Sequence, residues 1–150
     1  MAEHDTKELM IREALQEYIE VAKYCINFDK TTDEQWRSTA GCYGYPAGLL
    51  LLSIVDAIGA EVVGGRNNTK QHFTILNHVD YYNLNLSEDI LEALRREYRN
   101  HLSHNAQIGE RVILDIGTKD DKIIETYEEI YKLNLKPFYL ISEKVVNRFL

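Results

Sequence analysis

The sequence predicts a mainly α-helical fold, a bundle of four to five helices with a small β-hairpin before the C-terminal helix. Apolar residues recur at three- and four-residue steps through most of the chain before residue 106, which is the helical period. The alternating pattern typical of strands is confined to a short region after residue 110. With 150 residues, 45% of them hydrophobic, the chain has the size and composition of one soluble domain spanning residues 1–150.

The first two expected helices are joined by a connecting stretch that contains glycine. Residues 7–28 repeat apolar side chains on one helical face. Pro46 suits the first turn of a second helix, which ends at about Val63, before Gly64 and Gly65. This second helix is apolar on almost every side, so we expect it at the centre of the bundle. A stripe of small residues along it would let another backbone approach closely, inside the bundle or across a dimer axis: Ser53, Ala57, Ala60 and Gly64.

Two more helices are expected before the strand-like region. A third helix of mixed polarity is predicted over residues 69–82, and a fourth from Ser87 to about Asn105. Ser87 is a favourable N-cap, and Glu88 and Asp89 fall in the first turn, where acidic side chains stabilise the helix dipole. The apolar face of this fourth helix is formed by Ile90, Leu91, Leu94, Tyr98 and Leu102.

The C-terminal third of the chain differs in pattern. Residues 111–116 form a short β-type run, residues 117–121 have the composition of a turn, and residues 131–135 alternate as a returning strand. Residues 123–129 fit a helix and a strand equally well. A last helix is predicted over residues 137–149, begun by a proline.

The net charge bears on which partners the protein can bind, and the cysteine spacing bears on the cellular compartment. A formal net charge of −7 gives no general attraction to nucleic acid or to anionic membrane, so a nucleic acid would need a local basic patch. Cys25 and Cys42 lack the spacing of a disulfide framework, which indicates buried thiols in a reducing compartment. The apolar run 47–63 contains two acids and falls short of a membrane span. We therefore expect a cytoplasmic protein that does not enter the membrane.

The densest basic patch is RREYRNHLSH, residues 95–104. On an α-helix, residues four apart share a face, so Arg96, Asn100 and His104 are expected on one exposed stripe, with Arg99 one step round it. Histidine can transfer a proton near neutral pH, and an arginine can hold a phosphate while charge develops on it. These groups suffice for metal-independent cleavage of RNA, in which the ribose 2′-hydroxyl attacks the adjacent phosphate; DNA lacks that hydroxyl.

The sequence RNHLSH at residues 99–104 resembles the R-x4-6-H motif of the HEPN superfamily, in which a polar residue often follows the arginine. HEPN domains are compact helical bundles, commonly dimeric, and many are RNases of toxin–antitoxin or defence systems, while others have lost catalysis. The resemblance covers residues 7–105 and the final helix, and the hairpin is a departure from it. It implies that His104 transfers the proton and Arg99 holds the phosphate. Asn100 would orient either the imidazole or the scissile group. The flanking residues expected to contact the RNA are Arg95, Arg96 and His101.

The same resemblance implies partners. Two motifs would meet across a homodimer and form one composite cleft, and an antitoxin or a nucleotidyltransferase-type protein is a possible partner. A non-catalytic HEPN-like module that binds a protein or a nucleotide is the alternative function, and a structural helical dimer is a third. No cofactor is expected. The sequence lacks the glycine-rich nucleotide-binding motifs GxGxxG (after a strand) and GxxxxGK(S/T), and the hydrolase motifs HExxH and GxSxG.

Other interpretations of the basic residues compete with this one. Arg66 to His72 also matches R-x5-H, but it begins in a Gly-Gly-Arg-Asn-Asn turn, whereas Arg99 and His104 end a long amphipathic helix. His72, His78 and the motif histidines could be drawn as a metal site, yet no carboxylate or thiol is spaced to complete it. Arg95 taken alone is expected to be a solvated cation that the helix dipole favours.

Asp56 is an acid within the apolar second helix. A buried carboxylate requires a partner, because desolvating an unpaired charge is costly. Arg99 or His104 would be a suitable partner. We therefore expect Asp56 to contact one of these two residues and to hold it in position, unless the carboxylate reaches solvent at a gap between helices.

Overall fold

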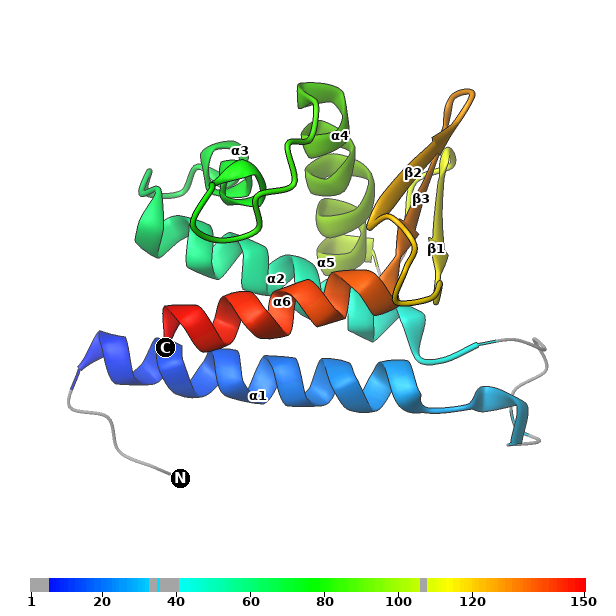
Figure 1. Ribbon diagram of the computed structural model, residues 1–150, viewed down its shortest axis with the longest axis horizontal. Coiled ribbons are helices and arrows are strands. Elements are labelled where there is room, and N and C mark those ends of the chain that lie inside the picture. Colours follow the sequence, from blue (N-terminus) through cyan, green and yellow to red (C-terminus); the bar gives the residue numbers. More distant parts are fainter. Residues whose placement is uncertain (1–5, 33–34, 36–40, 106–107) are drawn as a thin grey trace.

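Three long helices form the main layer of the molecule in the computed structural model (Figure 1). The structure describes residues 6–32, 35, 41–105 and 108–150, without the side chains of residues 32, 104 and 105. The helices α1 (Lys7–Asn27), α2 (Gly44–Val62) and α6 (Leu135–Phe149) pack against one another. α2 and α6 run antiparallel to α1 (Figure 1). The mainly α-helical class predicted from the sequence is thus confirmed.

The central position expected for the second helix is also confirmed. α2 begins two residues before Pro46, which lies in its first turn. By length and composition α2 is apolar enough to cross a membrane, contrary to the sequence-based expectation. Many of its apolar side chains lie in the protein core. The following α2 residues have no exposed surface: Ala47, Leu51, Leu52, Ile54, Val55 and Ile58.

The segment predicted as one helix over residues 69–82 is shorter and tighter than expected. It consists of α3 (Thr69–His72) and the 3₁₀-helix η2 (Phe73–Asn77). Beyond η2 the chain turns, and Asn83 and Asn85 adopt left-handed conformations with φ of 50° and 54°. Asparagine tolerates this region better than most residues, which is why it ends helices and forms loops.

The fourth predicted helix is continuous, but its central part is a π-helix, which is wider than an α-helix. Ser87 caps it as expected, since its Oγ accepts the N–H of Ile90 at 3.3 Å. In the π-helix the backbone hydrogen bonds reach one residue further than in an α-helix, and such turns are rare. The three consecutive parts are α4 (Glu88–Ala93), the π-helix η3 (Leu94–Asn100) and α5 (His101–Asn105).

Tyr98 attaches the π-helix to the sheet. Its side chain is fully buried, and its hydroxyl lies 2.9 Å from the Ile113 carbonyl and 3.0 Å from the Tyr131 carbonyl. Burial raises the pKa of Tyr98, so the hydroxyl keeps its proton and donates it to these carbonyls. The helix segment that carries Arg99 is therefore fixed to two strands.

The β region is a three-stranded sheet in the order β1-β3-β2. Its strands are β1 (Val112–Asp115), β2 (Ile124–Tyr127) and β3 (Ile130–Asn134). The hairpin is formed by β2 and β3, which pair antiparallel, whereas β1 pairs with β3 in parallel. The predicted hairpin between residues 111–116 and 131–135 was therefore wrong in its pairing, and the ambiguous residues 123–129 contain a strand.

Candidate functional site

Asp56 brings together two basic side chains from different parts of the chain. Its Oδ2 accepts an N–H from the Arg99 guanidinium at 3.0 Å, and its Oδ1 accepts the Nδ1–H of His72 at 2.7 Å. These three residues lie on α2, η3 and α3. The expected contact between Asp56 and Arg99 is confirmed. We call Asp56, His72 and Arg99 the Asp56 cluster.

His72 is held on both sides of its ring. Nε2 lies 2.5 Å from the carbonyl oxygen of Gly65, opposite the bond to Asp56. Both neighbours are hydrogen-bond acceptors, so the ring is fixed between the Asp56 carboxylate and the Gly65 carbonyl. The Asp56 cluster thus joins the Arg99 guanidinium and the His72 imidazole through one carboxylate.

Two glycines make this arrangement possible. A Cβ on Gly59 would lie 2.1 Å from the His72 carbonyl oxygen, so α2 and α3 approach here more closely than any side chain allows. Gly65, whose carbonyl binds His72, has a φ of +89°, a conformation suited to glycine. The close approach occurs at Gly59 and lies outside the stripe of small residues that the sequence indicated.

Arg99 is oriented but still accessible. Its side chain is 26% exposed and that of Asp56 is 20% exposed. One terminal nitrogen donates to Asp56 and the other donates to the Asn100 side-chain oxygen at 3.1 Å. Because a guanidinium has further N–H groups in the same plane, Arg99 can bind an additional anion from the solvent side. Asn100 thus contacts Arg99, and the orienting role predicted for it towards the histidine or the scissile group stays a prediction.

The flanking cations are paired with acids on their own helix. Arg95 binds Glu92, and the Arg96 Nε lies 3.9 Å from the same carboxylate. The His101 Nε2 lies 4.0 Å from a Glu97 carboxylate oxygen. Glu92 and Glu97 thus offset much of the positive charge that the sequence placed between residues 95 and 104. The patch is less basic than its arginines suggest.

Arg95 is not the solvated cation that was expected. Its side chain is 22% exposed, and among the described residues its buried Nε has no hydrogen-bond partner. Arg96, by contrast, is 64% exposed. The π-helix contains both residues and Asn100, so the turn that carries them is wider than the α-helical turn from which the exposed stripe was predicted.

His104 belongs to α5 by its backbone. Its side chain lies outside the described part of the structure, so the proton transfer predicted for His104 and its contact with Asp56 stay predictions. Within the part that is described, no group of three or more His, Cys, Asp or Glu side chains is placed to hold a metal ion. Cys25 and Cys42 are free thiols, and burial raises the pKa of each.

His72 is the member of the cluster that sequence reasoning missed. The sequence indicated His72 only as the end of the competing match from Arg66 and as a ligand of the disfavoured metal site, and Arg66 is not a member of the Asp56 cluster. A better signal was available, because Asp56 needed a partner and the glycines at positions 59, 64 and 65 permit a close return of the chain.

Comparisons of the chain with protein-family models, with curated proteins and with solved structures find no match. The HEPN resemblance thus depends on residues 99–104 and on the helical architecture.

Replacing Asp56 by alanine is expected to lower the free energy of unfolding by about 2 kcal/mol. The change would leave the partly buried Arg99 guanidinium without its carboxylate and the His72 Nδ1 without its hydrogen-bond partner. Urea unfolding would measure the loss. Asp80→Ala is the matched control, because the Asp80–Arg148 pair is exposed at 3.9 Å and is worth less than about 0.5 kcal/mol. Equal stability of the two variants would show that Asp56 does not hold its partners.

Proposed function

We propose that the chain is a metal-independent endoribonuclease of the HEPN type, with a toxin-like or defence role. The observation that carries the proposal is the state of Arg99: a carboxylate and an amide fix its orientation, while part of its guanidinium stays open to solvent. A cation held in place before the substrate arrives stabilises developing charge more effectively than a mobile one. His72 supports Arg99 indirectly, since it shares Asp56 with it.

In the proposed reaction the ribose 2′-oxygen forms a bond to the adjacent phosphorus, and the bond between phosphorus and the 5′-oxygen breaks. His104 takes the proton of the 2′-hydroxyl, and a proton from solvent water goes to the departing 5′-oxygen. The products are a 2′,3′-cyclic phosphate and a 5′-hydroxyl. Arg99 binds the non-bridging oxygens, where negative charge increases in the transition state.

This proposal predicts that purified protein cleaves mixed RNA, that a chelator does not stop the cleavage, and that the new ends carry 2′,3′-cyclic phosphate. A substrate with a 2′-deoxy sugar at the cut position should stay intact, because the nucleophile is missing. Gel analysis and mass measurement of the fragments would check these outcomes. Cleavage of the deoxy-substituted strand at the same position would contradict the mechanism.

The proposed active form is a homodimer. The positive charge near Arg99 is limited, since Glu92 and Glu97 pair with the flanking cations, while an RNA strand presents several phosphates. Two copies of the Asp56 cluster side by side would double the charge available to one strand. Light scattering at micromolar concentration should therefore give twice the mass of the 17.4 kDa chain. A monomeric mass would argue against a composite cleft.

The second candidate function is a non-catalytic HEPN-like module that binds a protein partner, such as an antitoxin, or a nucleotide. The pairing of Arg95 and His101 with acids on the same helix favours it, because these cations are then less available to RNA. For either function we propose a cytoplasmic location, supported by the free, buried thiols of Cys25 and Cys42.

A further inference from the structure

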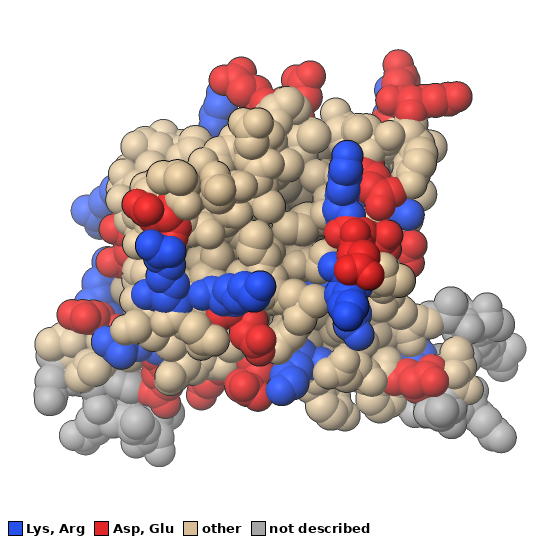
Figure 2. All heavy atoms as spheres, in the orientation of Figure 1, with Lys and Arg blue, Asp and Glu red and all other residues tan. Residues whose placement is uncertain are grey.

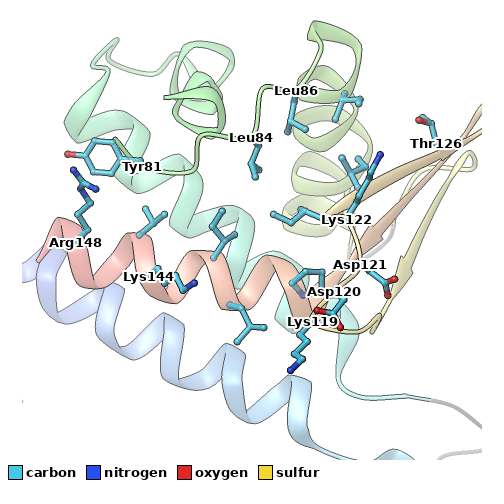
Figure 3. A pocket seen from close by; sticks show the side chains of 17 residues that line it. Tyr81, Leu84, Leu86, Lys119, Asp120, Asp121, Lys122, Thr126, Lys144 and Arg148 are labelled. Carbon is cyan, nitrogen blue, oxygen red and sulfur yellow. The ribbon is translucent and has the colours of Figure 1, made fainter. Parts of the chain in front are cut away.

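A large hollow lies on the face opposite the α1 side of α6, away from the residues of the Asp56 cluster. It is bounded by α6, the loop before α4, the start of α4 and β2, and its volume is about 1110 Å³ (Figure 3). Most of the surface at the centre of this face is uncharged, and charged side chains surround it (Figure 2). A hollow of this size is large enough to receive several side chains of another molecule.

The walls of the hollow are apolar and only partly covered. Leu84 and Leu86 point into it from the loop (Figure 3). Leu140 and Ile141 line it from α6. All four are half-buried, as are Ile90 and Ile123, which also line the hollow. Neighbouring apolar side chains that keep part of their surface in water gain free energy when a partner covers them.

One side of the hollow is the free edge of the sheet. β2 is an outer strand in the order β1-β3-β2. The N–H of Asn134 donates to the Ile123 carbonyl at 2.8 Å, so the residues paired at positions 123, 125 and 127 direct their backbone groups towards β3. The alternation of an antiparallel pair then directs the N–H and C=O groups of Ile124 and Thr126 outwards. Both residues line the hollow.

The rim of the hollow is positively charged, whereas the protein as a whole is acidic. Lys119 and Lys122 lie at the sheet end of the hollow, and Lys144 and Arg148 project from α6 (Figure 3). The carboxylates on the rim are those of Asp120 and Asp121, so the rim carries more positive than negative groups although the chain has a net charge of −7. A partner with acidic residues next to its apolar ones matches this rim.

We propose that this hollow binds an extended segment of a partner protein, which adds to β2 as a further strand of the sheet. The backbone of the segment would pair with the outward groups of Ile124 and Thr126, and every second side chain would enter the apolar hollow. Acidic residues flanking the apolar ones would face Lys119, Lys122 and Lys144. The proposal concerns protein binding and holds whether or not the chain cleaves RNA.

The test uses a phage-displayed library of random linear peptides selected on the full chain. The selected peptides should alternate β-branched or other apolar residues with polar ones and carry Asp or Glu at their ends. Thr126→Pro should weaken their binding at least about tenfold, because proline removes an outward N–H without affecting the bonds to β3. Thr126→Val keeps the N–H and should bind like the parent. Selected peptides that bind Thr126→Pro as well as Thr126→Val would overturn the proposal, as would a selection without this alternating pattern.

A second measurement does not depend on the proline variant being folded. In the parent protein, a selected peptide should slow amide hydrogen exchange at Ile124 and Thr126. Lys144→Glu should weaken binding, whereas Lys23→Glu makes the same charge change on α1, outside the hollow, and should not. Unchanged exchange at both amides, or equal effects of the two lysine variants, would exclude strand addition at β2.

Discussion

Replacing Arg99 by alanine should reduce RNA cleavage at least about 100-fold, the usual effect of removing a positioned group that stabilises transition-state charge. The guanidinium is already aligned by Asp56 and Asn100, so little reorganisation is needed when charge develops on the phosphate. Arg99→Lys should recover little of the activity, because an ammonium group cannot reproduce a planar fork bound on two sides. The measurement is the initial rate of cleavage of a defined RNA.

Arg96→Ala is the matched control, since Arg96 belongs to the same π-helix but is 64% exposed. It should change the rate only slightly. His104→Ala should abolish cleavage as Arg99→Ala does, whereas His101→Ala should have a much smaller effect. If His104→Ala cleaves RNA as fast as the parent, the enzymatic proposal fails and the binding-module proposal takes its place.

Gly59→Ala is expected to destabilise the protein by about 3 kcal/mol. The added methyl group would lie 2.1 Å from the His72 carbonyl oxygen, and 2.7 Å from the carbonyl carbon, so α3 would have to move away from α2. That movement would also separate His72 from Asp56. Thermal or urea unfolding would measure the change in stability, and loss of cleavage should accompany it.

Gly48→Ala is the matched change on the same helix. A Cβ at position 48 would meet the Leu102 side chain at 3.4 Å and the Leu114 side chain at 3.6 Å, which is ordinary contact. Alanine should therefore stabilise the protein there by about 0.5–1 kcal/mol, because it reduces the entropy of the unfolded chain. Loss of stability at both positions would show that the close approach at Gly59 is not the cause.

The helices were more predictable than the sheet for a physical reason. Helical periodicity over residues 7–28 and 46–63 reports a buried face directly, and the observed bounds differ from the predicted ones by only a few residues. The hairpin of β2 and β3 turns at Glu128 and Glu129, with Glu128 in a left-handed conformation at φ 54°. Tight turns of this kind usually contain glycine or asparagine, so the usual sequence signal was missing.

The candidate site was predictable in part. A carboxylate in an apolar helix had to have a partner, and that argument led to Arg99. The π-helix could not be predicted, because its hydrogen-bond shift leaves no periodic signature in seven residues. His72 was missed since its link to Asp56 depends on how closely two backbones approach, which residue spacing does not report.

The glutamates that lie among the arginines of this helix determine how binding should depend on salt concentration. Proteins that grip nucleic acid through many cations displace condensed counterions, and their affinity falls steeply as salt is added. Here Glu92 and Glu97 already neutralise much of the flanking charge, so in the proposed ribonuclease Arg99 is the principal group for a phosphate. On that proposal, the affinity for RNA should depend only weakly on salt concentration, and the choice of RNA should depend on strand shape and base stacking.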